Sequence, residues 1–367
     1  MSVPHIAENI LPGHPDRLAD AVVESLVDAA VAHDPEALVG VEAAVHRKKV
    51  FVTGRIAAGP PGSQLQIDLT GIVHGVFRKA GYTGRWEILP EVLSDLDLGP
   101  LDDDERGIRQ FSDDQNIIVG HAEGNKDTDY LPPACYVAGR LREVLSRVRE
   151  EHADRLGPDG KLLVRFQESE GAFAWERCNV SIQHVPETGY EELHRLVLPA
   201  FESGVQLLKD KLPGLHESWD PEKLRLNGAG IFSCGGPNGD NGLSGKKLVV
   251  DHFGPCVPIG GGALCGKDPH KVDRVGALRA RQIAVALVRD RGVREATVFL
   301  SYLPGEEKPD FVSAKVDGEW WDVGRIQQAI PLPDLSIEGS FRNLELGEVR
   351  WVPFAQNGYF GAVGRWG

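Results

Sequence analysis

A glycine-rich segment between residues 235 and 274 carries the side chains best suited to chemistry. It begins GGPNGDNGLSGKK at residue 235 and ends GGGALCGKDPHKVDR at residue 274. Glycine lets the backbone approach a ligand and turn successive N–H groups toward an anion. Lysines neutralise phosphate charge, and aspartates hold Mg²⁺ between phosphate oxygens. The segment therefore predicts a site for a polyphosphate and a divalent metal. A flexible linker explains the glycines, but not the charged residues set among apolar ones.

The loop is not a Walker A phosphate loop. Five residues separate Gly239 from Gly245 where that pattern needs four, and Lys247 occupies the position of its Ser or Thr. The residue types alone leave two reactions open. One is kinase-like phosphoryl transfer, and the other is attack at another atom of the nucleotide.

Two shorter motifs place acids next to predicted elements. PGHPDR, residues 12–17, sets His14 and Asp16 just before a helix, where Asp16 either caps the helix or serves as a hard oxygen ligand for Mg²⁺. FSDDQN, residues 111–116, has adjacent acids at 113 and 114 in an apolar neighbourhood. Adjacent acids beside a strand are also typical of a solvated turn, so this motif has a structural explanation as well.

A third short motif, LGPDGK at residues 156–161, precedes a predicted strand. Pro, Asp and Gly in sequence are typical of a turn. The turn explains Asp159 and Gly160 but does not require Lys161. On its own, the motif is a weak indication of function.

Composition excludes several classes of protein. The net charge of -14 argues against a nucleic-acid or membrane-surface binder, since either needs a basic face. No apolar run is long enough to span a membrane, and no signal peptide is evident. The five cysteines are odd in number and lack C-x-x-C spacing, which favours reduced thiols over disulfides or a zinc site. We expect a cytoplasmic protein with two or three compact units.

The spacing of apolar residues predicts the elements that position the motifs. We expect helices over 17–32, 131–152, 188–212 and 273–291, strands at 38–58 (two, with a basic turn at 46–49), 161–168, 177–185 and 295–303, and a further helix and strand within 64–90. Helices and paired strands do not alternate regularly, which favours an α+β fold with antiparallel sheets over a doubly wound one. The acidic segment 94–107 is expected to be a mobile, solvated loop.

Taken in order, the motifs resemble those of the S-adenosylmethionine synthetase (methionine adenosyltransferase) family. GHPDR is similar to the family's GHPDK, DDQN to its G-D-Q-G, and PDGK to its P-D-x-K. The stretches GGPNGDNGLSGKKLVVDHFG and GGGALCGKDPHKVDR are close to its two glycine-rich signatures. The resemblance runs from about residue 9 to the C-terminal YFGAVG, which is essentially the whole chain.

The resemblance implies a fold of three similar α+β subdomains, interlaced in sequence, with regions at about 1–110, 111–230 and 231–367. It implies homodimers or dimers of dimers whose active sites lie at the subunit interface. The implied reaction is attack of the methionine sulfur on C5′ of ATP, which expels the triphosphate for hydrolysis to diphosphate and phosphate. Because the thioether is the nucleophile, the protein has to align the reactants and stabilise charge on the leaving triphosphate.

The resemblance also assigns residues. Around ATP, His14 would lie near O5′ and the phosphates, Phe232 would stack on adenine, and Lys161, Lys246, Lys247 and Lys267 would hold the triphosphate. The implied metal ligands are Asp16 and Asp273 for Mg²⁺ and Glu42 near K⁺. Asp114, Asp159 and Asp240 match positions that contact the nucleoside or methionine, and Lys271 matches a position near the methionine carboxylate.

Departures from the family pattern are uneven. On the phosphate side they keep the charge, with Arg17 for a lysine and Lys246 for an arginine, although Pro12 replaces an acid. On the amino-acid side, G-G-E-I becomes TGRI, so Arg55 stands where a glutamate would meet the methionine ammonium. Pro304 replaces an aliphatic residue, and the loop after Leu93 is short and lacks a clear counterpart to the family's glutamine.

Three functions stay open at this point. The first is a divergent methionine adenosyltransferase in which another acid serves the ammonium or Arg55 points away. The second is a paralogue that adenosylates a different thioether or another nucleophile. The third is a non-catalytic regulatory partner of a synthetase, which the retained phosphate-side residues argue against.

Overall fold

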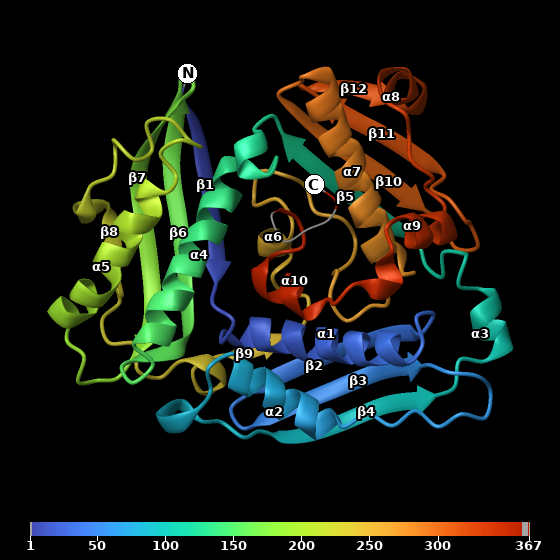
Figure 1. Cartoon of the computed structure of the whole chain (residues 1–367), viewed down its shortest axis with the longest axis horizontal. Coiled ribbons are helices and arrows are strands. Elements are labelled where there is room, and N and C mark those ends of the chain that lie inside the picture. Colours follow the sequence, from blue (N-terminus) through green and yellow to red (C-terminus); the bar gives the residue numbers. More distant parts are fainter. Residues whose placement is uncertain (1, 362–365, 367) are drawn as a thin grey trace.

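Three four-stranded sheets, each covered by helices, form the part of the chain that the structure describes (Figure 1). This computed structural model describes residues 2–361 and 366. The last residues of the YFGAVG segment, 362–364, lie outside that range. The sheets stand around a central region that holds the glycine-rich loops and the C-terminal segment (Figure 1).

The first sheet has the strand order β4-β3-β2-β9. Its strands are β2 (Leu38–His46), β3 (Lys49–Ala57), β4 (Glu91–Gly99) and β9 (Asn241–Leu243). The helices α1 (Pro15–His33) and α2 (Leu69–Lys79) lie against it. Side chains alternate between the two faces of a strand, so Val41 and Val52 are buried on the helix side. The opposite face, called here the open face, carries the register partners Gly40, Glu42, Ala44, Phe51, Thr53, Arg55, Leu93, Asp95, Asp97 and Leu243.

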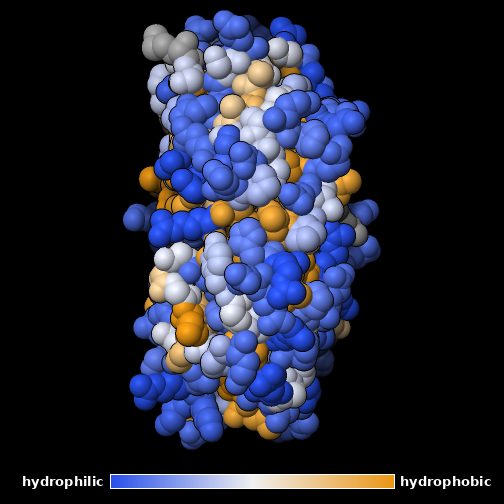
Figure 2. Space-filling view, turned by 90° about the vertical axis from the view of Figure 1, so that its left-hand side faces the viewer, coloured by the Kyte–Doolittle hydropathy of each residue, from blue (hydrophilic) through white to orange (hydrophobic). Residues whose placement is uncertain are grey.

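The second sheet has the order β1-β6-β7-β8. Its strands are β1 (Val3–Ile10), β6 (Leu156–Ser169), β7 (Ala172–His184) and β8 (Leu224–Leu226). The helix α4 (Pro133–Glu151) packs on β1 and β6, and α5 (Tyr190–Gln206) packs on α4. Their shared core includes Leu141, Phe166 and Phe201. The outer surface on this side is mostly hydrophilic with small apolar patches (Figure 2).

The third sheet has the order β12-β11-β10-β5. Its strands are β5 (Asn116–Glu123), β10 (Glu295–Tyr302), β11 (Phe311–Val316) and β12 (Glu319–Asp322). Around it lie α7 (Val272–Arg291), α8 (Val323–Ala329) and α9 (Ile337–Asn343). The helix α7 crosses β5 closely at Gly120, where an added Cβ would meet the Ala280 backbone at 2.2 Å.

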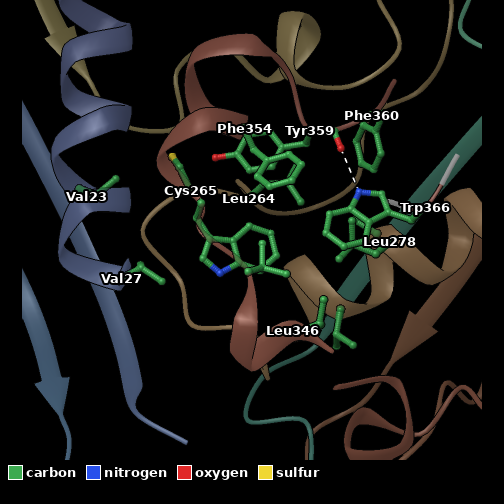
Figure 3. Close-up of a cluster of buried hydrophobic side chains, with 14 of the residues drawn as sticks. Val23, Val27, Leu264, Cys265, Leu278, Leu346, Phe354, Tyr359, Phe360 and Trp366 are labelled. Carbon is green, nitrogen blue, oxygen red and sulfur yellow. Dashed lines mark hydrogen bonds between the residues drawn. The ribbon is translucent and has the colours of Figure 1, made fainter. Parts of the chain in front are cut away.

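A shared core joins the first and third sheets at the centre of the molecule. Two short helices lie there, α6 (Leu248–Asp251) and α10 (Val352–Asn357). Figure 3 shows Val23 and Val27 of α1 facing side chains from the glycine-rich loop, α7 and the C-terminal segment. The Trp366 indole N–H donates to the Tyr359 carbonyl oxygen at 3.0 Å. Because Leu264 and Cys265 belong to this core cluster, the glycine-rich loop that bears them is anchored in the core.

Each sheet combines strands from distant parts of the sequence, as an interlaced fold requires. β1 belongs to the sheet of β6 and β7, β5 to the sheet of β10, and β9 to the sheet of β2. The predicted α+β fold is confirmed, with mixed sheets rather than purely antiparallel ones, because β3–β4 and β7–β8 pair parallel. The linear boundaries at residues 110 and 230 stay a prediction.

Most predicted elements are present, and three predictions are wrong. The turn expected at residues 158–160 lies within β6, the strand expected within 64–90 begins only at Glu91 as β4, and the third error concerns residues 94–107. The helices expected over 17–32, 131–152 and 273–291 correspond to α1, α4 and α7. The segment 94–107, expected to be a solvated loop, instead forms the second half of β4 and the helix α3 (Asp103–Gly107). Its acids suggested a loop, but the backbone pairs with β3 and a capping box at Asp102 and Glu105 starts the helix.

Candidate functional site

The start of α1 places His14 and Asp16 beside the first glycine-rich loop. His14, not Asp16, is the N-cap, because its Nδ1 accepts the Asp16 backbone N–H at 3.2 Å. Pro15 follows at the first helical position, where its fixed φ suits the turn. The alternative that Asp16 merely caps the helix is therefore wrong. The Asp16 carboxylate is free for other contacts.

His14 is held in its neutral form. The side chain is 1% exposed, and burial together with the nearby Lys161 charge lowers its pKa to about 3. Its Nε2 is buried and has no hydrogen-bond partner among the described residues. A neutral imidazole whose Nε2 has no partner can form a hydrogen bond with a ligand, but it brings no positive charge to the site.

Asp16 joins α1 to the first glycine-rich loop. Its Oδ2 lies 2.8 Å from Lys247 Nζ, its Oδ1 lies 3.6 Å from Lys246 Nζ, and Oδ1 also accepts the Leu243 N–H at 3.0 Å. Burial opposes ionisation, yet the hydrogen bonds from Lys247 and Leu243 lower the pKa of Asp16. The loop comes this close because residue 242 is glycine, whose added Cβ would meet the Pro15 oxygen at 2.1 Å.

The start of β6 brings a second carboxylate and lysine to the same place. Asp159 is buried, and its Oδ2 accepts the Gly236 N–H at 2.8 Å. Burial raises the pKa of Asp159 to about 6, against that hydrogen bond and the Lys161 charge. Asp240 is near enough for its charge to act on both groups. It partly opposes the lowering of the His14 pKa and adds to the raising of the Asp159 pKa. Residues from three distant parts of the chain thus meet around Asp16.

A second group of charges surrounds Lys267. Its Nζ lies 2.6 Å from Asp273 Oδ1 in the first turn of α7. Gly262 lies against this pair, since an added Cβ would be 1.6 Å from the Asp273 oxygen and 3.0 Å from Lys267 Nζ. The pair lines a cleft of about 580 Å³ together with Asp114. Lys267 also lines an adjoining cleft of about 570 Å³ that contains Glu42 and Gly245.

Arg55 lies at the edge of this region and is paired with acids. Its Nη1 lies 2.6 Å from Asp97 Oδ2 on β4, and its Nε donates to Glu105 Oε1 of α3 at 2.8 Å. On the open face it neighbours Glu42 and Thr53, which line the second cleft. The Arg55 charge is thus opposed by two carboxylates of the segment 91–107.

The remaining predicted residues lie farther out or in ion pairs. Lys271 Nζ contacts the Asp113 carboxylate. The half-buried Phe232 lies beside Gly235, whose added Cβ would meet its ring at 3.0 Å. Pro304 is exposed, and the cleft is lined by its neighbour Leu303 instead. The structure thus brings most of the predicted residues to one region, while their roles stay predictions.

Sequence reasoning missed a buried ionic layer beneath the site. Asp20 and Glu24 lie on α1 and are fully buried. They pair with Arg17 and Arg274, respectively. The available signal was the i, i+4 spacing of two acids inside the otherwise apolar helix RLADAVVESL.

Comparison with known proteins is consistent with this geometry. Residues 3–91 match the model of the S-adenosylmethionine synthetase N-terminal domain, and residues 234–366 match that of the C-terminal domain. The S-adenosylmethionine synthase of Zymomonas mobilis is 32% identical over 378 residues, covering 97% of this chain and 92% of that protein. The synthase of Prochlorococcus marinus strain AS9601 is 32% identical over 345 residues, covering 88% and 81%.

A solved structure described as an unusual S-adenosylmethionine synthetase from Campylobacter jejuni superposes with a TM-score of 0.83. The two chains are 25% identical, and the match covers 97% of this chain and 94% of that one. The chain belongs to the S-adenosylmethionine synthetase family. Among the helices that the structure describes, none is long and apolar enough to cross a membrane.

Proposed function

We propose that this protein transfers the adenosyl group of ATP to the sulfur of L-methionine. The sulfur lone pair forms a bond to C5′, the C5′–O5′ bond breaks, and its electrons leave with the triphosphate. This step gives S-adenosylmethionine. Water then cleaves the triphosphate to phosphate and diphosphate. The observation that carries the proposal is that Lys246 and Lys247 pair with Asp16 and Lys267 pairs with Asp273, in two loops that line a shared cleft.

The chain's own residues supply alignment and charge. Lys161, Lys246, Lys247 and Lys267 would hold the triphosphate, whose negative charge grows as the C5′–O5′ bond breaks. The unsatisfied Nε2 of neutral His14 would bond to O5′ or a phosphate oxygen. Phe232 would stack on adenine, and Asp114, Asp159 and Asp240 would contact the nucleoside or the amino acid. The protein contributes no nucleophile, because the thioether is one.

The acids fit Mg²⁺ in the way that nucleotide enzymes usually bind it. Mg²⁺ takes one or two carboxylates, substrate phosphates and water rather than a closed protein cage. No cluster of three or more His, Cys, Asp or Glu suited to a metal occurs within the described residues, in keeping with such an open site. Asp16 and Asp273 each lie against a lysine and would share the metal with phosphates. Bound Mg²⁺ would neutralise charge on the triphosphate, and Glu42 would lie near K⁺.

The contacts of Arg55 favour methionine as the acceptor. Because Asp97 and Glu105 both pair with Arg55, the three side chains together carry a net negative charge, which does not repel an ammonium group. Lys271 would receive the amino-acid carboxylate after exchanging its Asp113 partner. A thioether without the amino group is the second candidate. What favours it is not the contacts of Arg55 but its residue type, since the family resemblance predicts at this position an acid that would meet the ammonium.

We also propose that the protein is a cytoplasmic homodimer or dimer of dimers with active sites between subunits. The open face of the first sheet supports this arrangement. It exposes Phe51, Leu93 and Leu243 at 42%, 40% and 48%, next to the ion-paired Arg55 and the cleft residue Glu42. Exposed apolar side chains clustered on one sheet face are typical of an interface.

Purified protein incubated with ATP, Mg²⁺, K⁺ and a panel of thioethers tests the reaction. The panel contains methionine, its analogue without the amino group and its analogue without the carboxylate, and sulfonium products are identified by mass spectrometry. We expect the methionine adduct with release of phosphate and diphosphate, and no product from Lys247→Met. Product from the deaminated thioether alone would replace methionine as the acceptor. ATP that stays intact with every thioether would favour a regulatory protein instead.

A further inference from the structure

One carboxylate beneath the site contacts both lysine-bearing loops. Asp20 lies on α1, one turn after Asp16, and is fully buried. Its Oδ1 accepts the Gly245 N–H at 2.8 Å and the Cys265 S–H at 3.3 Å. Gly245 directly precedes Lys246 and Lys247, and Cys265 lies two residues before Lys267. A single oxygen atom therefore joins the two loops, and it does so at residues that lie one or two positions before the lysines.

Asp20 is itself fixed by an ion pair. Burial raises the pKa of Asp20 to about 7, and the Arg17 charge opposes that shift. Arg17 Nη1 lies 3.0 Å from Asp20 Oδ2 and 2.6 Å from Asp251 Oδ1, and both acids are buried. Asp251 ends α6, which follows Lys247 along the chain. The first loop is thus tied to α1 on both sides of its lysine pair, through Gly245 before it and Asp251 after it.

The second loop has a separate tie one turn farther along α1. Arg274 Nη2 donates to both oxygens of Glu24, at 2.9 and 2.8 Å, and to the Leu264 carbonyl oxygen at 2.7 Å. Leu264 adjoins Cys265, so the loop is held from the Glu24 side as well. Removal of the Cys265 contact would therefore loosen the link between the loops without releasing the second loop from the core.

The link depends on a neutral thiol as hydrogen-bond donor. Burial raises the pKa of Cys265 well above its usual value, and the Asp20 charge acts in the same direction. Figure 3 shows the side chain pointing between α1 and the C-terminal aromatic residues. Serine would keep a donor at this position, whereas alanine would remove it.

We propose that Asp20 is a positioning residue that fixes the spacing between the two lysine-bearing loops through Gly245 and Cys265, so that both loops bind one triphosphate chain as a unit. Asp20 touches no substrate and acts through the loops. The inference rests on the proposed function only for the triphosphate as ligand, and it does not depend on which thioether is the acceptor.

Binding of inorganic tripolyphosphate in the presence of Mg²⁺, measured by titration calorimetry on the full chain, tests this role without requiring turnover. Loss of one buried hydrogen bond predicts that Cys265→Ala weakens binding about fivefold, while Cys265→Ser stays within about twofold. Asp20→Asn keeps an acceptor but removes the charge that Arg17 faces, and we expect about tenfold weaker binding. Circular dichroism and thermal unfolding check that each variant folds.

A double-mutant cycle separates positioning from general stability. Lys247→Met and Lys267→Met are measured singly and together, in the natural protein and in Cys265→Ala. If one oxygen couples the loops, the losses are non-additive in the natural protein and become additive in Cys265→Ala. Equal binding by Cys265→Ala and Cys265→Ser, or unchanged coupling, would overturn the positioning role and leave the proposed function standing. Failure of the natural protein to bind tripolyphosphate would overturn both.

Discussion

Arg55 stands where the resemblance to the family predicts a glutamate, and its contacts explain how an arginine is accommodated there. It links β3 to β4 through Asp97 and to α3 through Glu105. The same segment is held from a second side, where Arg106 lies 3.1 Å from Asp34. The arginine therefore neutralises two acids of the segment 91–107 and ties β4 and α3 to β3.

Replacing Arg55 by Glu should therefore not increase methionine turnover. The variant would place three carboxylates together, and we expect kcat/KM for methionine to fall. The free energy of unfolding should drop by about 1 kcal/mol, a small value because the pair is partly exposed. Kinetics and urea titration measure the two effects. Arg325→Glu, in the exposed Arg325–Glu319 pair, is the matched control for stability. Higher methionine turnover in Arg55→Glu would mean that Arg55 itself blocks the ammonium.

The buried Asp159 should make stability depend on pH. Its pKa is raised to about 6, so between pH 4 and 6 the folded protein binds a proton that the unfolded chain releases. This residue then stabilises the fold at low pH, and its contribution is lost as the pH rises through 6, at no more than about 1.4 kcal/mol per pH unit. Urea unfolding of Asp159→Asn at pH 4.5 and 6.5 should show a flatter dependence than the natural protein. The exposed Asp154→Asn serves as control. Parallel pH curves would rule out the buried acid as the source.

The residue types predicted the lysines and aspartates that the structure brings together, but not the buried residues that support them. Glycine, lysine and aspartate in one segment have few explanations other than an anion and a metal, so Lys246, Lys247 and Lys267 could be selected directly. Asp20 could not, because an acid inside an apolar helix looks like any surface acid until its partners are known. Its ion-pair partner Arg17 is close in sequence, but its loop partners Gly245 and Cys265 lie more than two hundred residues away.

At the scale of elements, glycines let the loops place charged side chains where any larger residue would collide with them. Gly262 is the clearest case, since the Lys267–Asp273 pair occupies the space of its missing side chain. Gly262→Ala should separate that pair and reduce adenosyl transfer about a hundredfold, the usual consequence of misplacing a catalytic group by about 1 Å.

Steady-state kinetics with ATP and methionine measure this effect, and circular dichroism confirms the fold. Gly139→Ala is the control, because its added Cβ on α4 meets nothing within 4 Å. It should keep full activity and gain about 0.5–1 kcal/mol of stability from better helix propensity. Full activity in Gly262→Ala would show that the Lys267–Asp273 pair is not required.

The spacing of apolar residues predicted the long helices and the β2–β3 hairpin. It did not predict strands that pair with distant parts of the chain. The helices α1, α4 and α7 carry their own pattern, and the β2–β3 hairpin is marked by its basic turn. The strand β4 was missed because its acids resemble a loop, and only the parallel register with β3 makes it a strand. No local signal states that β1, β5 and β9 join sheets whose other strands lie far along the chain.

At the scale of the whole molecule, the open face should mediate dimerisation. Phe51→Asp would bury a charge in an apolar contact, and we expect it to give monomers that lose adenosyl transfer. Light scattering reports the mass, and product formation reports the activity. Leu207→Asp is the control, since Leu207 is 70% exposed and lies at the end of α5, which packs on α4 beside the second sheet. A Phe51→Asp protein with unchanged mass would exclude this face as the interface.

The exchange of strands between sheets also orders events during synthesis. β1 leaves the ribosome first, yet its partner β6 follows only after roughly 150 more residues, when Ile10 can meet Lys161. At cellular translation rates the first strand waits roughly 8–30 s with its backbone unpaired. His14 and Asp16 follow directly behind that strand, so the amino-terminal part of the candidate site is made well before the lysine-bearing loops that it contacts. Nascent chains stalled before residue 169 should therefore bind a chaperone at β1, a segment that pairs with β6 in the finished protein.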